Sequence, residues 1–596
     1  MKKILFLLLM ILSLWTLGAC GLKNIPIEDD DPVIQEPGDD PVVGEPDEDP
    51  IVDEIDEVTS ARIQAIIDEM TLEDKVGQMF MVGFNGTSVP SSLNQAIDTA
   101  RFGNFIYFGA NVADDSLVSE MSRQIQNKVM STLKIPAFIS MDQEGGMVVR
   151  FAGEATHFIG NMALAATLDP HNAYLVGQYS GMELRHFGIN TNLAPVLDVN
   201  NNPDNPVIGI RSYSDDAQTV SDFGLQMIEG LRSSQVMATV KHFPGHGDTS
   251  IDSHYGLPMI PHDLDRLYDI ELAPFIDAIE AGVDTIMTAH IIFSAIDSDY
   301  PATLSYKVLT ELLRNTLGYE GLIMTDEMRM NAIQNNFSAA EAAVLAVQAG
   351  VDILLYAEST STSLQAIEGI LEALDKGTLK EERIDASVRR ILEKKIKYGL
   401  FEDYLPREDV STSLFATHRA WNQSLVEDSI TMPIGHVDWF QKEQKTLLIS
   451  TVCTRYPLEN GYQINTTANS LAMVGANYLQ QAGVEDVDAN VISSTLTTTQ
   501  INTIVNQAKG YSQVVIAVEN VSASQATLIN ELAKENFNLL VVALRNPYDY
   551  QMYVGVEHYV CTYGYFQSSV QAIMDLLLGK FEAVGILPVH IDNLNS

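Results

Sequence analysis

Short apolar runs alternate with segments of helical periodicity between residues 60 and 401. We interpret eight of these runs as strands: 79–84, 104–108, 137–141, 191–196, 237–241, 285–289, 321–325 and 352–355. The intervening segments 173–187, 218–232, 264–281 and 339–349 are typical of helices, and Gly350 is a plausible C-cap for the last one. Alternating strands and helices form parallel sheets through crossover connections. Eight units of this kind predict an α/β fold, an inserted (β/α)8 barrel of the TIM type, rather than an open sheet.

A second, smaller α/β sandwich is predicted after the barrel. Its apolar runs 446–450, 514–518 and 539–544 are typical of strands, while 501–509 and 526–534 have helical periodicity. Residues 570–578, Gly579 and 585–589 predict a helix, a turn and a last strand. We therefore divide the chain into a signal peptide (1–20), an acidic tether (21–60), a TIM-type barrel (61–401), a connecting segment (402–439) and an α/β sandwich domain (440–596).

The first twenty residues have the parts of an export signal. Two lysines precede an apolar run at residues 4–17, and the small residues Gly18 and Ala19 precede Cys20. Such a run is too short for a stable membrane-spanning helix. The sequence Leu-Gly-Ala-Cys resembles the end of a bacterial lipoprotein signal, which implies that Cys20 is lipidated. The alternative is an ordinary signal in which this cysteine has no special role.

The segment after Cys20 is strongly acidic. Residues 21–60 contain fifteen acids and six prolines but only one basic residue, Lys23. Such a composition buries too little apolar surface to offset its ordering entropy, so we expect an extended tether. The whole chain has a formal net charge of −44. We therefore expect no nucleic-acid partner, since binding a phosphate backbone requires cationic side chains.

Ionisable residues lie at the end of five of the predicted barrel strands or just after it: Asp142, Asp198, Lys241 with His242, His290 and Asp326. The loops after the strands build the active site in barrels of this kind. For any one of these residues, a buried structural role is as plausible as a functional one. Their shared position relative to the strands favours function for the set.

The loop from Lys241 to His254 offers two interpretations. His242, His246, Asp248 and His254 are possible zinc ligands, although a glycine-rich loop does not predict their geometry. Alternatively, Asp252 and His254 form a dyad, because a spacing of two residues can place both side chains on one side of the loop. A carboxylate on one imidazole nitrogen fixes the tautomer and leaves the other nitrogen to transfer a proton. The second interpretation predicts a general acid/base.

An apolar strand at 321–325 ends abruptly in Asp326-Glu327. A carboxylate in this place can attack an electrophilic carbon or coordinate a metal. Helix capping by either acid is the simpler alternative, and it is the one favoured by this segment taken alone.

Six segments resemble glycoside hydrolase family 3, in particular its β-N-acetylglucosaminidases. They occur in the family's order at 141–151, 192–199, 210–213, 241–254, 287–290 and 325–327. The run Lys-His-Phe-Pro-Gly-His-Gly followed by Asp-Ser-His is the most specific of them, and Gly-Ile-Leu-Pro-Val at 585–589 is similar to the family's second domain. Many relatives have Asp-Asp-Leu where this chain has Asp326-Glu327-Met328, so we expect different local packing there.

The resemblance implies specific roles. Asp326 is the expected nucleophile, and Asp252 with His254 the expected acid/base dyad. The residues expected to hold the hydroxyls of the terminal sugar are Asp142, Arg211, Lys241 and His242. The implied reaction is a retaining, exo-acting hydrolysis through a covalent glycosyl-aspartate, and it needs no metal or organic cofactor.

Substrate and location follow from combining this resemblance with the export signal. We expect removal of terminal N-acetylglucosamine from cell-wall oligosaccharides, by an enzyme lipid-anchored to the outer face of the bacterial cytoplasmic membrane. Chitin oligosaccharides remain open as substrates, as do phosphorolysis in place of hydrolysis and a non-catalytic sugar-binding lipoprotein. We expect Cys453 and Cys561 to be packed thiols rather than a disulfide.

Overall fold

The computed structural model describes residues 56–596 except 113, 152, 359–360, 408–411, 453–466, 593 and 595–596. The predicted signal peptide with Cys20, almost all of the predicted tether, and Cys453 lie outside the described residues. Cys561 is a buried free thiol. Among the described helices, none has both the length and the apolar character needed to cross a bilayer.

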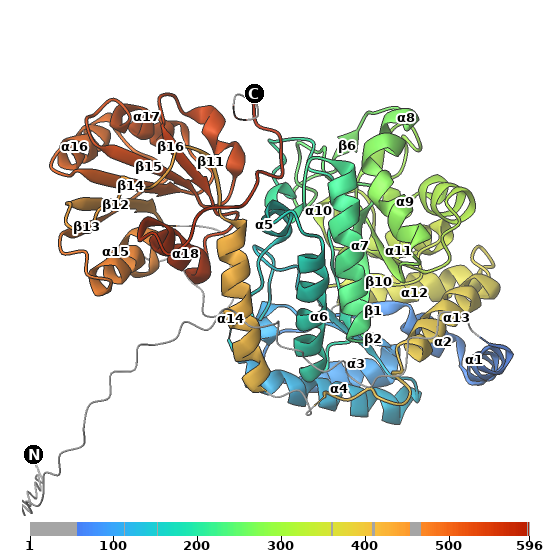
Figure 1. The fold of residues 1–596 in the computed structure, drawn as a ribbon. Coiled ribbons are helices and arrows are strands. Elements are labelled where there is room, and N and C mark those ends of the chain that lie inside the picture. The colour runs from blue at the N-terminus through green and yellow to red at the C-terminus, as the bar shows by residue number, and fades with distance from the viewer. Residues whose placement is uncertain are drawn as a thin grey trace, which may run out of the picture. The chain divides into compact units, whose positions relative to one another are not determined.

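Eight parallel strands form the first sheet (Figure 1). They are β1 (Phe80–Val82), β2 (Asn104–Ile106), β3 (Phe138–Met141), β4 (Thr191–Asn192), β5 (Met237–Phe243), β7 (Thr285–Thr288), β9 (Leu322–Thr325) and β10 (Leu354–Tyr356). Strand β10 pairs with β1, and a single bridge from Met324 to Ile353 joins the other edge. The sheet is thus a nearly closed barrel, which confirms the predicted fold and all eight predicted strands. A separate pair, β6 (Met259–Ile260) and β8 (Ile292–Phe293), lies in the loops.

The helices of the barrel domain are α1 (Glu57–Glu69), α2 (Leu72–Gln78), α3 (Ser91–Ala100), α4 (Val118–Leu133), α5 (Asn161–Ala166), α6 (His171–His186), α7 (Ala217–Ser233), α8 (Leu264–Arg266), α9 (Ala273–Glu280), α10 (Asn331–Gln334), α11 (Ala339–Ala349), α12 (Ser361–Asp375) and α13 (Glu381–Lys397). The side chain of Ser338 caps α11, and Gly350 ends it at a φ of 125°, which favours glycine. The helix predicted over 264–281 consists instead of α8, a π-helical segment at Leu267–Glu271, and α9. Pro274 explains the division, because it lacks an N–H and its ring excludes the carbonyl four residues earlier.

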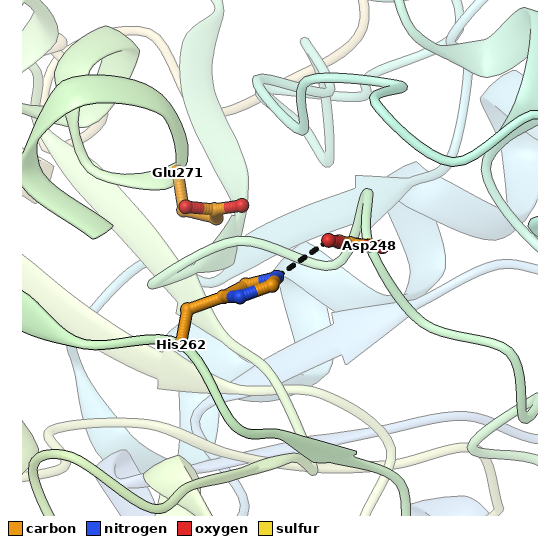
Figure 2. Close-up of side chains that lie close together, drawn as sticks. All are labelled: Asp248, His262 and Glu271. Atoms are coloured by element: carbon orange, nitrogen blue, oxygen red, sulfur yellow. Dashed lines mark hydrogen bonds and ion pairs between the residues drawn. The ribbon is translucent and has the colours of Figure 1, made fainter. Parts of the chain in front are cut away.

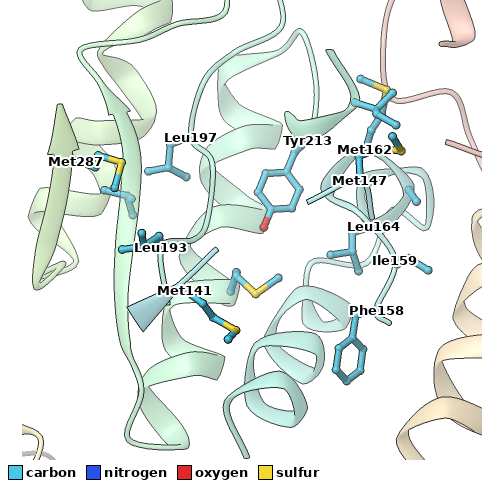
Figure 3. Packing of buried hydrophobic residues seen from close by; sticks show 14 of the residues in the cluster. Met141, Met147, Phe158, Ile159, Met162, Leu164, Leu193, Leu197, Tyr213 and Met287 are labelled. Carbon is cyan, nitrogen blue, oxygen red and sulfur yellow. The ribbon is translucent and has the colours of Figure 1, made fainter. Parts of the chain in front are cut away.

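Apolar side chains fill the space beneath the strand ends. Figure 3 shows Met141, Leu193 and Met287 from three strand regions packed in one cluster, with Tyr213 nearby. All four are at most 2% exposed. Burying one such side chain stabilises the fold by about 1.5–3 kcal/mol, so this layer gives the loops above it a rigid base.

The second sheet has six strands in the order β11-β16-β15-β14-β12-β13. Their bounds are β11 (Thr431–Ile434), β12 (Thr446–Thr451), β13 (Val487–Ile492), β14 (Gln513–Val518), β15 (Asn538–Ala543) and β16 (His558–Cys561), with helices α15 (Leu471–Gln481), α16 (Thr498–Ala508), α17 (Ala523–Leu532) and α18 (Gln567–Leu577). Only β11 is antiparallel to its neighbour. The predicted α/β domain is confirmed, whereas β11, β13 and β16 were not predicted.

Two predicted segments have more structure than expected. Helix α1 begins at Glu57, inside the predicted tether, because Asp56 accepts a hydrogen bond of 2.7 Å from the Thr59 N–H and caps the helix. The connecting segment 402–439 contains helix α14 (Thr412–Ser429) and strand β11.

The predicted last strand at 585–589 is wrong, because the segment forms one isolated bridge and no ladder with a neighbouring strand. Gly585 makes one bridge to Thr431 of the second sheet. Beyond that point the Ile586 N–H donates to the carbonyl of Ala166 in α5. The Pro588 carbonyl accepts from Ser214 Oγ at 2.5 Å.

Candidate active site

A cavity of about 160 Å³ lies at the carboxyl ends of the barrel strands. Predicted site residues that line it are Asp142, Arg211, Lys241, His242, His254 and Asp326. Asp252 is not part of the lining but is hydrogen-bonded to His254. The structure therefore brings together all the barrel residues to which the family resemblance gives a role, whereas Asp198 and His290 do not line the cavity.

Asp326 follows β9 directly, and its Oδ1 accepts a 2.7 Å hydrogen bond from the Glu327 N–H. Burial alone would raise the pKa of Asp326, but the neighbouring imidazoles of His290 and His242 hold it below its usual value. The carboxylate is therefore ionised at neutral pH, as a nucleophile must be. The capping interpretation is wrong for the next helix, α10, since its N-cap is Met330 and has no side-chain capping bond.

Asp252 and His254 form the expected dyad within the long loop after β5. One carboxylate oxygen of Asp252 accepts from the His254 backbone N–H at 2.8 Å and from its ring Nδ1 at 2.7 Å. These bonds keep the Nδ1 proton in place and leave Nε2 to exchange a proton with a ligand. The His254 side chain is 59% exposed, whereas that of Asp252 is 17% exposed. The imidazole is thus accessible and its carboxylate partner is shielded.

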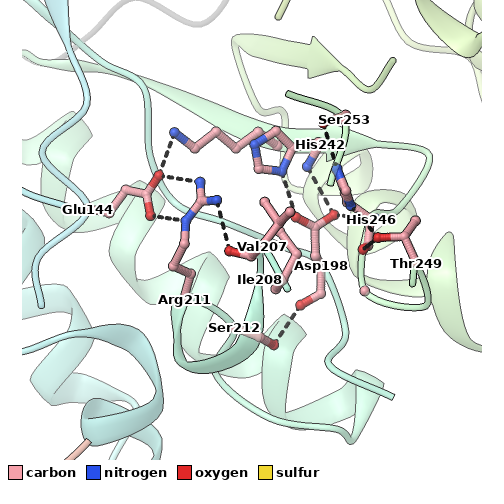
Figure 4. Close-up of polar contacts among 12 residues, drawn as sticks. Glu144, Asp198, Val207, Ile208, Arg211, Ser212, His242, His246, Thr249 and Ser253 are labelled. Atoms are coloured by element: carbon pink, nitrogen blue, oxygen red, sulfur yellow. Dashed lines mark hydrogen bonds and ion pairs between the residues drawn. The ribbon is translucent and has the colours of Figure 1, made fainter. Parts of the chain in front are cut away.

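A network of opposite charges forms one wall of the cavity (Figure 4). Arg211 binds Glu144 through two hydrogen bonds of 2.9 and 2.8 Å. The Lys241 ammonium lies 2.7 Å from Glu144 and 2.8 Å from Asp142, which also pairs with Arg150 at 2.8 Å. Burial opposes ionisation, but Arg211 and Lys241 lower the pKa of Glu144 to about 2. This wall therefore presents fixed charges that can form hydrogen bonds to the hydroxyl groups of a ligand.

Sequence reasoning gave no role to Glu144 or Arg150, although both line the cavity. Glu144 had a usable signal, because it lies two residues after Asp142 in the same strand-end motif. No local sequence signal indicated Arg150. Its contact with Asp142 depends on a turn of the backbone at Gly145 and Gly146, which are both at positive φ.

His242 is oriented by Asp198, the acid that follows β4. Asp198 is fully buried and accepts from His242 Nδ1 at 2.7 Å and from the His246 N–H at 2.7 Å. Burial opposes the charge of Asp198, but its contact with His242 lowers the pKa of Asp198. Asp198 is thus a positioning residue beneath the cavity.

The structure does not bring the four zinc candidates of the loop together: of His242, His246, Asp248 and His254, only Asp248 belongs to a group of close potential ligands among the described residues. His242 binds Asp198, His246 lies between Thr249 and Ser253, and His254 binds Asp252. Asp248 instead accepts from His262 Nε2 at 2.6 Å, with Glu271 nearby (Figure 2).

The guanidinium of Arg266 lies 3.1 Å from Glu271 and 3.8 Å from Asp248. A cation from the chain itself therefore already balances these acids. We therefore interpret the contacts among Asp248, His262, Glu271 and Arg266 as structural: they hold the loop that leads to Asp252 and His254. We assign no metal to them.

Replacing Arg211 by lysine should weaken substrate binding. Lysine keeps the charge but cannot reproduce the two parallel bonds to buried Glu144. Loss of one charge-assisted hydrogen bond predicts a decrease in kcat/KM of roughly 10- to 100-fold. Steady-state kinetics on a chromogenic glycoside would measure it, with the exposed Arg419→Lys as a control. Unchanged kinetics would contradict the proposed part of Arg211 in binding.

Residues 71–394 match the family model "Glycosyl hydrolase family 3 N terminal domain", which covers more than half of the chain. The chain belongs to glycosyl hydrolase family 3. The match covers the barrel from α2 to α13 and all of the cavity residues named above. Glu327, which follows Asp326, accepts hydrogen bonds from Arg329 Nε at 2.9 Å and from the Ala357 N–H at 3.0 Å.

Among family members, the β-hexosaminidase A of Pseudoalteromonas piscicida is 35% identical over 57% of this chain and 63% of its own length. The β-hexosaminidase of Xanthomonas oryzae pv. oryzae is 30% identical over 49% of this chain and 87% of its own length. This chain thus spans less than two thirds of the first relative.

A solved structure of a glycoside hydrolase family 3 β-N-acetylglucosaminidase from Paenibacillus sp. str. FPU-7 is similar in both domains. It is 36% identical, has a TM-score of 0.80, and the match covers 88% of this chain and 99% of that one.

Proposed function

We propose that this chain is a retaining, exo-acting β-N-acetylglucosaminidase. The observation that carries the proposal is that one cavity is lined by His254, bonded to the shielded Asp252, and by the ionised Asp326. Non-catalytic sugar binding needs neither a nucleophile nor a proton donor. The names of the similar enzymes from Pseudoalteromonas, Xanthomonas and Paenibacillus support the same activity.

In the first step, an Asp326 carboxylate oxygen attacks the anomeric carbon while the bond to the leaving oxygen breaks. His254 Nε2 gives its proton to that oxygen, and Asp252 stabilises the imidazolium before transfer. The product is a glycosyl ester on Asp326 with inverted configuration, together with neutral His254. Most retaining glycosidases use a second carboxyl about 5–5.5 Å from the nucleophile in this role.

In the second step, neutral His254 removes a proton from water, and the resulting oxygen attacks the anomeric carbon. The ester bond breaks, Asp326 regains its charge, and a second inversion restores the β configuration. A neutral base repels an anionic acceptor less than a carboxylate does. This property of His254 favours phosphate as the second candidate acceptor.

The sugar is held by the charged wall. We assign its hydroxyl contacts to Asp142, Arg211, Lys241 and His242, since all four present ionised or polar groups to the cavity. Glycans of the cell wall and chitin both end in the unit that this reaction removes, so both are candidate substrates.

The deciding experiment is a product analysis with chitobiose and defined muropeptides, each with and without phosphate. Hydrolysis should release β-N-acetylglucosamine first, visible by NMR before mutarotation. A sugar phosphate would instead identify phosphorolysis. Absence of any cleavage, including that of a chromogenic β-N-acetylglucosaminide, would support the non-catalytic alternative.

We also propose that the chain is exported and anchored through a lipid on Cys20. The support is the signal-like sequence that ends at this cysteine. Several acyl chains on one residue give durable anchoring, since each buried methylene contributes about 0.8 kcal/mol. Changing Cys20 to serine should move the protein from the membrane fraction to the soluble or unprocessed fraction. An unchanged distribution would contradict the anchor.

A further inference from the structure

His246 lies in the long loop after β5, and the reaction steps above give it no role. It is buried at the edge of the cavity. Burial lowers the pKa of His246 to about 4, so the imidazole is neutral at neutral pH. In a neutral imidazole one ring nitrogen donates a hydrogen bond and the other accepts one. The partners of these two nitrogens therefore define what the residue holds in place.

Both ring nitrogens of His246 bind hydroxyl groups of the same loop (Figure 4). Nδ1 lies 2.9 Å from Thr249 Oγ1, and Nε2 lies 3.1 Å from Ser253 Oγ. The Thr249 hydroxyl donates its proton to the His246 carbonyl at 3.2 Å, so its oxygen accepts from Nδ1–H. Nε2 is then the acceptor, and the Ser253 hydroxyl donates to it. One imidazole thus holds the loop at two positions.

His246 is itself fixed to the barrel through its backbone. Its N–H donates to the buried Asp198 at 2.7 Å, and its carbonyl accepts from Asn205 Nδ2 at 2.8 Å. The next residue, Gly247, packs so closely that a Cβ there would lie 1.6 Å from the carbonyl oxygen of Val199. The ring of His246 is therefore a rigid support for the loop.

Ser253 stands between the two residues of the dyad and is the buried point of this part of the loop. It is 2% exposed, whereas Ile251, His254 and Tyr255 are exposed. Burying a hydroxyl costs free energy unless the group is hydrogen-bonded, and the bond to His246 Nε2 offsets this cost. The contacts of Ser253 thus explain why the loop turns inward at this residue.

The Ser253 carbonyl links the dyad to the segment that follows the nucleophile. It accepts from the Ala332 N–H at 3.3 Å, in the first turn of α10. Such an N–H has no partner within its own helix, and α10 has no side-chain cap. Helix α10 follows Asp326 after a short turn in which the Met330 N–H donates to the Glu327 carbonyl at 3.0 Å. Ser253 therefore connects the loop of the proton donor with the segment of the nucleophile.

Asp252, Ser253 and His254 belong to one compact turn. The Asp252 carbonyl accepts from the Tyr255 N–H at 2.9 Å, and the Asp252 side chain binds both the backbone and the ring of His254. The turn is thus held together by its own bonds, while the two bonds of Ser253 tie it to its surroundings. A displacement of Ser253 would carry His254 with it.

We propose that His246 and Ser253 are positioning residues for the acid/base dyad, and that they set the place of His254 Nε2 relative to the Asp326 carboxylate. The inference rests on the proposed function, because it takes His254 as the proton donor. Both groups must reach one glycosidic bond, and a misplacement of about 1 Å can lower the rate on the order of 100-fold.

The test is Ser253→Ala, with Ser253→Thr as the conservative variant that restores the hydroxyl. Loss of the bond to His246 should lower kcat/KM for chitobiose roughly 5- to 50-fold, because it leaves a buried acceptor unpaired. A dinitrophenyl glycoside should lose less than about twofold, since its leaving group departs without a proton. Threonine should recover most of the loss. Ser250→Ala, a change of an exposed serine in the same loop, is the matched control.

A double-mutant cycle tests the pair itself. His246→Leu should show the same dependence on the leaving group as Ser253→Ala. In the His246→Leu background, Ser253→Ala should cost little more, because the bond between the two residues is already absent.

No loss in Ser253→Ala, equal losses on both substrates, or additive losses in the double variant would overturn the inference and leave the proposed function intact. A wild-type chain that cleaves neither substrate would refute the proposed function, and the inference with it.

Discussion

Asp326→Asn should reduce kcat/KM for a chromogenic β-N-acetylglucosaminide by a factor on the order of 10⁴ to 10⁶. The amide has the size of the carboxylate but lacks the charge and the nucleophilic oxygen. The pKa of Asp326 is held low by neighbouring imidazoles, although burial opposes this, so the wild-type group is ionised and ready to attack. The variant should still fold, because its Oδ1 can accept the Glu327 N–H as before.

Trapping makes this prediction specific to one residue. A slow fluorinated substrate should form an ester that peptide mass spectrometry finds on Asp326 alone. Glu327→Gln is the matched control, since it changes the adjacent carboxylate, which is bound to Arg329 rather than presented as a nucleophile. A label on another residue, or full turnover by Asp326→Asn, would refute the assignment.

His254→Ala should lower kcat/KM by about 10² to 10⁴ on substrates with a sugar leaving group. The loss should be much smaller with a dinitrophenyl glycoside, because that leaving group departs without a proton. Asp252→Asn should show the same dependence in a milder form, since the imidazole remains but its tautomer and charge lose their support. If the loop had only a structural role, the variants would lower kcat/KM equally for the sugar substrate and for the dinitrophenyl glycoside.

The positions of the barrel strands and their terminal residues were predictable because both depend on local pattern. A buried strand is a short apolar run, and in this barrel the residue after it faces the site. That rule located Asp142 and Asp326, whereas Lys241 and His242 lie within β5 near its carboxyl end. It did not locate the dyad, whose prediction depended on the two-residue spacing of Asp252 and His254 within a loop.

Which side chains of the site bind one another was less predictable, because the paired residues lie far apart in the chain. Asp198 and His242 are 44 positions apart, and no local pattern selects them as a pair. Arg211 binds Glu144 across 67 positions in the same way. Strand β13 was missed for a different reason: it is an edge strand whose central residues are only partly buried, so it lacks the apolar run of a central strand.

The C-terminal tail has a consequence for the order in which the molecule is completed during synthesis. His590 N–H donates to Asp215 at 2.7 Å, next to the bond from Ser214 to Pro588. These contacts hold the loop at residues 214–215, just before α7. The tail residues that make them, Pro588 and His590, are synthesised after all eight barrel strands. The barrel can therefore form these contacts to Ser214 and Asp215 only after the second domain has been synthesised.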